Sequence, residues 1–519
     1  MQNLTSVSDL LERSVQLYPE RIAVFDGYRS MRYEELANEV NLLASGLSQL
    51  GIVKGDRVIV CLPNWHELVI IYFALSKIGA ILVPCDVKYR QQELEYIVNN
   101  SKPKAAFVVQ DQEHLDIFLN RIHGHQIKHI LTVRFKENGL TSFEELLELG
   151  KKRVAPNVNL DVKKDVFAIL YTSGSTGKPK GAQLTHSNVV HVAISTAKHL
   201  NNTCQDVFLV PVPATHVFGL VPGTLTVISV GAKSVFMEKF KPNAALQLIE
   251  EEKVTVHLGV PTMFKLELDY LSRQKFDLSS LRTGILAGEQ CRKELVRKIR
   301  TEMNCDIVIS YGMTETSGGI TFTSFEDNDY LRTETVGKPV DGAIIKAVDE
   351  NGNEVRPGEV GELVCKGDGI MKGYYEMPSM TLEAFDNDGW FYTGDLGVIN
   401  KQGYIRIVGR KKETINRGGY KIYPREIEEI FYEHPGVLEV AVFGMPDDIL
   451  GEITCAVIKT KSKSWENEEL MKDFLKNKVA KYKVPDKIHF INHFPLTESG
   501  KINKKELKKM ILEMKTELN

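Results

Sequence analysis

The segment YTSGSTGKPKG, from Tyr171 to Gly181, concentrates glycine, hydroxyl and lysine residues directly after the apolar run DVFAIL. Glycine lets backbone N–H groups approach an anion closely, hydroxyl groups supply further donors, and lysine supplies positive charge. These residue types therefore suit a loop that surrounds phosphate groups. A plain surface turn is the alternative, because glycine, serine and proline also build exposed turns.

Two familiar phosphate-binding motifs do not fit this segment. Gly174 and Gly177 are separated by two residues instead of four, and Pro179 follows Lys178, so the kinase-like or NTPase P-loop pattern fails. The GxGxxG pattern of Rossmann domains does not occur in the segment either. From these residues alone, a phosphate loop and a surface loop both stay open.

Composition describes a protein of several domains. With 519 residues, the chain is too long for a single core. Its 43% hydrophobic and 26% charged residues are typical of a soluble globular protein, and a net charge of −3 gives no field to recruit nucleic acid or an anionic membrane. The first residues lack the apolar core of a secretory signal. The most apolar stretch, residues 67–85, is too short to span a bilayer and predicts a buried helix followed by a strand.

The seven cysteines are scattered and form no CxxC pair. This spacing indicates neither a zinc site nor a disulfide framework, and it favours a reducing compartment, for which the cytoplasm is our prediction. Each cysteine is expected to be a small buried hydrophobic residue instead of a catalytic nucleophile.

Short β-branched strands alternate with amphipathic helices over most of the chain, which predicts an α/β fold with layered, largely parallel sheets. One such segment begins at Tyr33, keeps Leu36, Val40, Leu43, Leu47 and Leu50 at helical spacing, and has Gly51 as the residue just past the helix end. After about residue 335, turns at 351–352 and 357–358 predict a smaller β-rich subdomain. We therefore predict a large N-terminal domain, 1–408, and a small mobile α+β C-terminal domain, 409–519.

Several motifs together resemble those of the adenylate-forming superfamily, which contains acyl-CoA synthetases, luciferases and peptide-synthetase adenylation domains. The glycine-rich segment resembles the superfamily's signature loop, and the other motifs occur in the family's order over more than three hundred residues. They are RYEELA at Arg32, GDRVIVCLPN at Gly55, PATHVFGL at Pro213, LAGE at Leu286, YGMTET at Tyr311, VGKP at Val336, WFYTGDLG at Trp390, GRKKETINRGGYKIYPREIE at Gly409 and PLTESGKI at Pro495.

The resemblance implies a reaction in two halves that uses ATP, Mg²⁺ and coenzyme A. A carboxylate first attacks the α-phosphorus of ATP, and a thiol then attacks the resulting acyl-adenylate. Both halves build charge on oxygen, so positioning and electrostatic stabilisation are expected to dominate. The family's loop implies a β- and γ-phosphate site made by Thr172, Ser173, Gly174, Ser175, Thr176, Gly177 and Lys180.

The motif YGMTET is the family's core segment. By resemblance, Tyr311 stacks on adenine, Thr314 hydrogen-bonds the α-phosphate, and Glu315 is the magnesium ligand. Gly288 and Glu289 are implied to border the adenine. Family members often carry Asn, Gln or Asp two residues before the tyrosine, where this chain has Ile309, so adenine recognition through backbone carbonyls is expected instead.

Other motifs imply a ribose site and a catalytic cation. Asp395 would accept hydrogen bonds from both ribose hydroxyls, and Arg410 would add a donor on the ribose side. Lys501 would bridge the attacking carboxylate and the α-phosphate in the adenylation step. It precedes a lysine-rich segment in which Leu507, Met510, Ile511 and Met514 predict an amphipathic helix.

The second half-reaction implies rotation of the C-terminal domain. Lys412 falls at the family's hinge position, and Gly418 and Gly419 are implied to line the pantetheine tunnel.

The motif PATHVFGL implies an acyl site with His216, counted among the catalytic residues, at its mouth. Thr215, Phe218 and Gly219 are expected to face the substrate, with Val260, Gly312 and Met313 completing the wall. A peptide-synthetase domain would place an aspartate near Gly219, where this chain has Leu220 and Val221, so a fatty or aryl acid is expected instead of an amino acid.

These features predict an ATP-dependent carboxylic acid:CoA ligase, acting on a medium- or long-chain fatty acid. Alternatives are an aryl-acid CoA ligase and a stand-alone enzyme that loads an acyl or aryl acid onto a carrier-protein phosphopantetheine. A non-catalytic adenylate sensor is disfavoured because both Lys501 and Glu315 are present. The expected partners are small molecules and, in the second alternative, an acyl carrier protein; neither a nucleic-acid partner nor a transmembrane segment is expected.

Overall fold

The computed structural model describes residues 6–119, 127–172, 179–289, 292–476, 478–495 and 502–516. Contacts within the chain divide it into two compact units, each made of two stretches of sequence. Unit 1 contains Met1–Ile345 and Cys365–Phe391, and unit 2 contains Lys346–Val364 and Tyr392–Asn519. Among the helices in these ranges, none has the length and apolar character needed to cross a bilayer.

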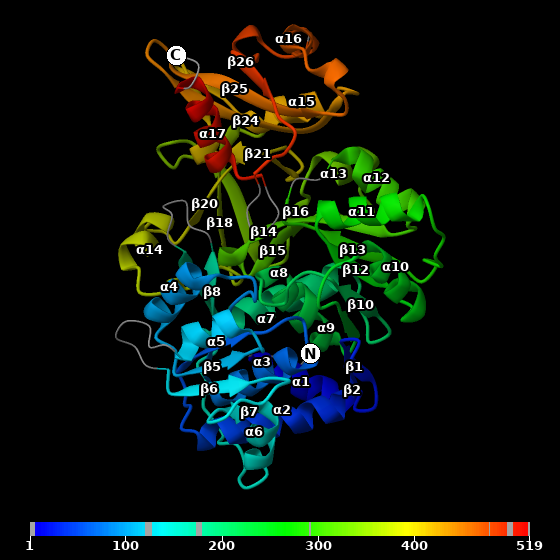
Figure 1. Ribbon diagram of the computed structural model, residues 1–519, viewed down its shortest axis with the longest axis vertical. Coiled ribbons are helices and arrows are strands. Elements are labelled where there is room, and N and C mark those ends of the chain that lie inside the picture. The colour runs from blue at the N-terminus through cyan, green and yellow to red at the C-terminus, as the bar shows by residue number, and fades with distance from the viewer. Residues whose placement is uncertain are drawn as a thin grey trace. The chain divides into compact units, whose positions relative to one another are not determined.

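A nine-stranded sheet forms one layer of unit 1 (Figure 1). Its central strands are parallel, whereas β2, β15 and β16 pair antiparallel at its two ends. The carboxyl ends of the parallel strands therefore share one edge of the sheet. In order across the sheet, the strands are β16 (Lys338–Pro339), β15 (Gly318–Phe322), β14 (Asp306–Met313), β13 (Thr283–Leu286), β12 (Val256–Gly259), β10 (Val207–Val210), β11 (Lys233–Phe236), β1 (Ile22–Phe25) and β2 (Ser30–Arg32).

An eight-stranded sheet forms the second layer of unit 1. It is parallel from β8 to β7, and β9 and β19 continue it antiparallel. Figure 1 shows β5, β6 and β7 side by side at one end of this sheet. In order, the strands are β19 (Gly373–Tyr374), β9 (Lys180–Thr185), β8 (Val166–Thr172), β4 (Ile81–Pro84), β3 (Arg57–Cys61), β5 (Ala105–Val108), β6 (His129–Thr132) and β7 (Thr141–Ser142).

Helices pack against both sheets around one large hydrophobic cluster and two smaller ones. The helices Tyr33–Gln49 and Phe143–Gly150 approach each other closely, and glycine at position 150 permits this. A Cβ there would lie 2.0 Å from the carbonyl oxygen of Leu42. The helices of unit 1 are α1 (Val7–Leu17), α2 (Tyr33–Gln49), α3 (His66–Ile78), α4 (Gln91–Ser101), α5 (Gln112–Leu119), α6 (Phe143–Gly150), α7 (His186–His199), α8 (Val217–Leu220), α9 (Thr226–Val230), α10 (Pro242–Glu251), α11 (Pro261–Leu271), α12 (Lys293–Glu302), α13 (Asp329–Glu334) and α14 (Pro378–Ala384), with the π-helix η1 (Val221–Leu225) and the 3₁₀ turn η2 (Thr314–Thr316).

Unit 2 is an α+β structure. A four-stranded sheet consists of β17 (Ala343–Val348), β18 (Val360–Gly367), β20 (Phe391–Ile399) and β21 (Ile405–Arg410). A five-stranded sheet consists of β23 (Tyr420–Ile422), β22 (Ile415–Arg417), β25 (Gly451–Thr460), β24 (Val437–Asp447) and β26 (Lys487–Phe490), with the helices α15 (Pro424–Tyr432), α16 (Glu468–Lys476) and α17 (Lys504–Thr516) and the 3₁₀ turns η3 (Lys411–Glu413), η4 (Lys463–Trp465) and η5 (Lys481–Lys483).

The predicted α/β class with layered, largely parallel sheets is confirmed. Gly51 follows α2 with a φ of 81°, as expected of a residue just past a helix end. Residues 67–85 form most of the buried helix α3 and the strand β4. The predicted boundary at 408/409 lies inside β21, and the contact-based division starts unit 2 earlier, at Lys346. The predicted rotation of the C-terminal domain, with its hinge at Lys412, stays a prediction.

Candidate active site

The parallel strands bring the predicted acyl and adenine residues of unit 1 to one sheet edge. Strands β10, β12, β13 and β14 run in the same direction, and each is followed by a predicted site segment. Such an edge is the usual place for ligands in open α/β sheets. The residues collected there are Thr215 and His216 after β10, Val260 after β12, Gly288 and Glu289 after β13, and Tyr311, Gly312, Met313 and Thr314 at the end of β14.

The turn that carries Thr314 and Glu315 is tightly fixed. A Cβ on Gly312 would lie 1.9 Å from the carbonyl oxygen of Gly318, so only glycine fits between β14 and β15. The hydroxyl of Thr316 accepts the N–H of Met313 at 2.9 Å and donates to the carbonyl oxygen of Gly318 at 2.6 Å. Because these bonds close the turn, Glu315 projects from a preorganised segment.

Glu315 has a defined polar neighbour that sequence analysis did not single out. The hydroxyl of Tyr374 donates to Glu315 Oε1 at 2.9 Å. Burial, with the charge of Glu315 and its hydrogen bond, raises the pKa of Tyr374, so the phenol keeps its proton and donates. A half-buried carboxylate of this kind fits a magnesium ion that also binds phosphate oxygens. The only available signal was the GYY triplet, which by itself indicates a strand end.

The strands β8 and β9 place the two ends of the predicted phosphate loop side by side. Thr172 pairs with Lys180 across these antiparallel strands. Lys180 Nζ lies 4.9 Å from the ring centroid of Tyr374. The other predicted phosphate-binding residues, Ser173, Gly174, Ser175, Thr176 and Gly177, lie outside the described residues.

On the adenine side, Gly288 has a φ of 86° and a Cβ there would lie 3.2 Å from Cγ1 of Val260. Ile309 is buried against the core cluster that includes Phe264. The carbonyl oxygen of Ile309 accepts the N–H of Thr323 at 3.0 Å. The position of Ile309, two residues before Tyr311, therefore belongs to the core.

On the acyl side, His216 is an exposed residue directly before α8. A Cβ on Gly219 would lie 2.3 Å from the carbonyl oxygen of Pro213, so glycine lets α8 pack against the preceding loop. The helix continues into the π-helix η1, a feature that is frequent at functional sites. Leu220 and Val221 are fully buried, which leaves apolar side chains where an amino-acid-specific domain would need a carboxylate.

Unit 2 holds the predicted ribose residues. Asp395 pairs with Arg410 between β20 and β21, and Arg410 Nε lies 3.6 Å from Asp395 Oδ1. Next to them, Lys411 Nζ lies 2.7 Å from Glu362 Oε2, and Glu362 Oε1 accepts the N–H of Gly394. Glu362 therefore connects the part of β20 just before Asp395 to Lys411, at the start of the predicted hinge.

The predicted hinge and tunnel residues also lie in unit 2. Lys412 is exposed in η3. Gly418 and Gly419 form the two-residue turn between β22 and β23, with φ values of 57° and 87° that favour glycine. Lys501 lies outside the described residues.

An internal ion pair anchors the helix that follows Lys501. Lys504 Nζ lies 2.8 Å from Glu428 Oε1 and 3.3 Å from Glu413 Oε2. Burial alone would lower the pKa of Lys504, but the two carboxylates together raise it by more than burial lowers it. The net shift of the pKa is upward, and the ammonium stays charged. The start of α17 is thereby tied to both α15 and η3.

Asp26, His66 and Glu67 are the one group with metal-ligand spacing in the described part of the chain. Arg134 already supplies a cation to this group, because its Nη2 lies 2.5 Å from Asp26 Oδ2 and its Nε 2.8 Å from Glu67 Oε1. Burial alone would raise the pKa of Asp26, but hydrogen bonds from the His66 ring and from the backbone of Arg29 and His66 have the larger effect. The net result is a lowered pKa. We call these four side chains, Asp26, His66, Glu67 and Arg134, the Arg134 cluster; a guanidinium takes the place of a metal.

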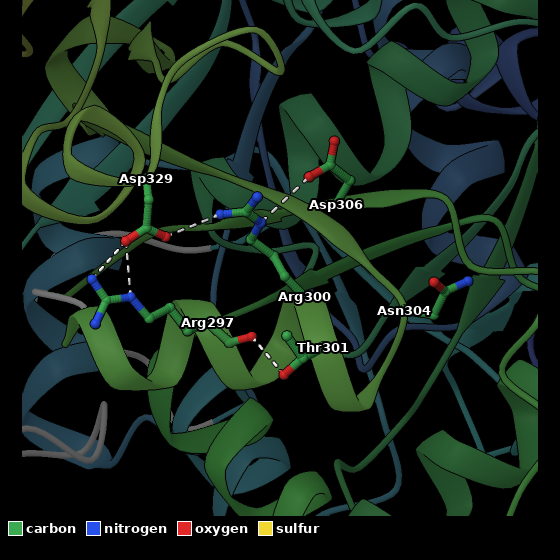
Figure 2. A pocket seen from close by; sticks show the side chains of 6 residues that line it. All are labelled: Arg297, Arg300, Thr301, Asn304, Asp306 and Asp329. Atoms are coloured by element: carbon green, nitrogen blue, oxygen red, sulfur yellow. Dashed lines mark hydrogen bonds and ion pairs between the residues drawn. The ribbon is translucent and has the colours of Figure 1, made fainter.

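A surface pocket of about 430 Å³ lies elsewhere in unit 1 (Figure 2). Figure 2 shows Arg297 and Arg300 directed at Asp329, and Arg297 Nη2 lies 2.6 Å from Asp329 Oδ2. Asp306 begins β14, so the pocket is at the end of the strand opposite to Tyr311. No predicted site residue lines it, and its arginines are neutralised by neighbouring carboxylates.

Six of the seven cysteines lie in the described ranges, and all six are free thiols. Five of these, Cys61, Cys85, Cys305, Cys365 and Cys455, are buried. Burial raises the pKa of the Cys305 thiol, which suits a small core residue.

Comparisons with known proteins show the family of this chain. A model of the AMP-binding enzyme family matches residues 11–375, and a model of the AMP-binding enzyme C-terminal domain matches residues 426–501. YngI of Bacillus subtilis (strain 168) is 37% identical over 98% of this chain and 98% of its own length. The medium-chain fatty-acid–CoA ligase of Escherichia coli (strain K12) is 34% identical over 99% of this chain and 91% of its own length.

Among solved structures, o-succinylbenzoate coenzyme A synthetase (MenE) of Bacillus subtilis, in complex with ATP and a magnesium ion, superposes with a TM-score of 0.82. It is 29% identical and covers 96% of this chain and 99% of its own. With matches of this extent, the chain belongs to the AMP-binding enzyme family of the adenylate-forming superfamily.

Proposed function

We propose that this protein is an AMP-forming acyl-CoA synthetase that uses ATP, Mg²⁺ and coenzyme A to convert a medium-chain fatty acid into its CoA thioester. The observation that carries this proposal is the shared edge of the parallel strands, where the acyl-site segment follows β10 and the turn of Thr314 and Glu315 follows β14. The name of the Escherichia coli relative supports the acid and the thiol. The ATP and magnesium of the MenE structure support the nucleotide and the metal.

In the first half-reaction, the acid's carboxylate oxygen forms a bond to the α-phosphorus of ATP while the bond to pyrophosphate breaks. Thr172, Lys180 and the loop between them would hold the β- and γ-phosphates, and Thr314 would hold the α-phosphate. Glu315 would ligate Mg²⁺, which supplies positive charge against the phosphate oxygens. Lys501 would stabilise charge that grows on the reacting oxygens.

In the second half-reaction, the thiol of coenzyme A gives its proton to solvent, its sulfur bonds to the acyl carbon, and the bond from that carbon to the phosphate oxygen breaks, so AMP leaves. Asp395 would keep the ribose in place, as a carboxylate that can accept from two hydroxyls. A rotation at Lys412 would withdraw Lys501 and present Gly418 and Gly419 to the pantetheine arm.

The specificity of the acyl site supports a fatty acid over an amino acid. Leu220 and Val221 are buried apolar residues, so an ammonium group would be left without a counter-charge from them. An aryl acid fits the same apolar lining and remains the second candidate. The spacing of the cysteines supports a reducing compartment, and we propose the cytoplasm.

Pyrophosphate exchange with a panel of aliphatic, aryl and amino acids tests the first half-reaction. We expect exchange with aliphatic acids of medium length, weaker exchange with aryl acids, and background with amino acids. Exchange with amino acids alone would overturn the assignment. In the second half, saturable acyl-CoA formation without any carrier protein supports the CoA ligase, whereas transfer only to a phosphopantetheinylated carrier protein supports the carrier-loading alternative.

A further inference from the structure

Tyr374 contacts Glu315, the proposed magnesium ligand, and Lys180, a proposed phosphate-binding residue. The following inference rests on the proposed function. The hydroxyl of Tyr374 donates to Glu315 Oε1 at 2.9 Å. The face of its ring lies 4.9 Å from Lys180 Nζ, within the range of a cation–π interaction. One side chain thus contacts both the expected metal ligand and the expected phosphate-binding cation.

The fold fixes Tyr374 before any ligand arrives. Strand β19 pairs antiparallel with β9, placing Tyr374 opposite Ala182, close in sequence to Lys180. The N–H of Tyr374 donates to the hydroxyl of Thr381 at 2.9 Å. The side chain belongs to the main core cluster of unit 1, and the residue is 8% exposed. Close packing of this kind leaves the ring few alternative rotamers.

The same short segment also holds the backbone of Glu315. The N–H of Met371 donates to the carbonyl oxygen of Glu315 at 2.8 Å. Glu315 is therefore held at its main chain by Met371 and at its carboxylate by Tyr374. Any buried tyrosine needs an acceptor for its hydroxyl. A backbone carbonyl would satisfy the hydroxyl of a buried tyrosine. Tyr374 instead has a carboxylate at its hydroxyl and an ammonium over its ring, which is a more specific arrangement.

We propose that Tyr374 is a positioning residue of the adenylation site, which orients the Glu315 carboxylate for Mg²⁺ and supports the Lys180 ammonium for the phosphates. The hydroxyl and the ring have separate tasks. The hydroxyl sets which carboxylate oxygen faces the metal, since Oε1 is engaged by the phenol. The ring supports Lys180 through its face and does so without the metal.

Two substitutions separate these tasks. Tyr374→Phe keeps the ring and removes the hydroxyl, and Tyr374→Leu removes both. Calorimetric titration with ATP, in the absence and presence of increasing Mg²⁺, measures the effects without turnover. For Tyr374→Phe we expect unchanged Mg²⁺-free ATP binding and a Mg²⁺ requirement raised about tenfold or more, as when the hydrogen-bond partner of a metal ligand is lost. For Tyr374→Leu we expect the same shift plus Mg²⁺-free ATP binding weaker by about two- to fivefold.

The neighbouring Tyr375 provides a matched control. Its N–H donates to the carbonyl oxygen of Gly181, a backbone contact that Tyr375→Phe retains. We expect Tyr375→Phe to bind ATP and Mg²⁺ as the unmodified protein does. A shift of the Mg²⁺ requirement in Tyr375→Phe equal to that in Tyr374→Phe would overturn the proposal, because the effect would then belong to general packing.

A double-mutant cycle with Glu315→Gln keeps the test independent of folding. If Tyr374 acts through Glu315, adding Tyr374→Phe to Glu315→Gln should leave the Mg²⁺ requirement of Glu315→Gln unchanged. Additive losses, or an unchanged Mg²⁺ requirement in Tyr374→Phe alone, would refute the positioning role. If the unmodified protein neither binds ATP nor exchanges pyrophosphate, the proposed function fails instead, so the two failures are distinguishable.

Discussion

Replacing Arg134 by methionine removes the cation of the Arg134 cluster while keeping much of the side-chain volume. Arg134 bonds to Asp26 and Glu67, whose side chains are 0% and 6% exposed. Its guanidinium also lies 4.2 Å from the ring centroid of Trp65. The substitution would leave the two buried carboxylates without a guanidinium, although Asp26 would keep its hydrogen bonds with the His66 ring and with backbone N–H groups.

The expected loss of stability follows from that burial. Removing one partner of a buried ion pair costs about 3–5 kcal/mol, because the remaining charge has no counter-charge and no water. We expect a loss of this size for Arg134→Met near pH 7. Arg273 is the matched control, because its pair with Asp269 has the same type of contact at 2.8 Å but side chains 70% and 59% exposed. Arg273→Met should cost less than about 1 kcal/mol.

The loss should also depend on pH in one direction. The lowered pKa of Asp26 means that its carboxylate stabilises the fold above the ordinary aspartate pKa of about 4, and that this contribution is lost as pH falls. In Arg134→Met we expect a higher pKa for the Asp26 carboxyl than in the unmodified protein, so it would protonate at a higher pH. The stability difference between Arg134→Met and the unmodified protein should therefore shrink from pH 7 towards pH 4.

Urea unfolding followed by tryptophan fluorescence measures this difference at several pH values, and Trp65 reports from within the contact shell of Arg134. A loss that is the same at pH 7 and pH 5 would contradict the electrostatic explanation. A loss no larger than that of Arg273→Met would show that the cluster is not effectively buried.

Three further outcomes are expected. Lys501→Ala should slow pyrophosphate exchange by on the order of 10²–10³-fold and slow CoA capture of preformed acyl-adenylate far less; equal losses in both halves would contradict the assigned role. Asp395→Ala should raise the KM for ATP by at least about tenfold, with the KM for the acid unchanged, and a matching rise in both would count against a ribose contact. Gly312→Ala should cost about 1–3 kcal/mol of unfolding free energy, because its Cβ would meet backbone atoms of Gly318, whereas Gly409→Ala meets nothing within 4 Å and should cost little; similar costs for both would refute the packing argument.

Periodic patterns predicted much of the fold, because burial repeats along the sequence. Leu36, Val40, Leu43, Leu47 and Leu50 were expected to keep helical spacing; the first four are buried in α2, and Leu50, at its C-terminal end, is half-buried. Leu507 and Ile511 of the predicted C-terminal helix are likewise buried. The spacing of apolar residues along a helix or strand shows which of its faces is buried. This face can therefore be predicted without knowing which element packs against it.

The site was predictable only where a motif carried it. Tyr374 was missed because its contact with Glu315 depends on the pairing of the two-residue strand β19 with β9, and so short a strand has no period. The Arg134 cluster was missed for a similar reason. Arg134 has a φ of 62° outside any helix or strand, and its partners come from distant segments. Long-range pairing of short segments leaves no local pattern to detect.

The course of the chain between its two units limits how the protein can be dissected. The polypeptide passes from one unit to the other after Ile345, Val364 and Phe391, so no single cut separates them. A fragment that begins at residue 409 would leave behind β18, β20 and most of β21. In that fragment Gly409 and Arg410 would lose their β20 partners Leu396 and Asp395, whereas the five-stranded sheet would keep all its strands. To obtain unit 2 as one fragment, Lys346–Val364 would have to be joined to Tyr392–Asn519 by a new loop that replaces Cys365–Phe391.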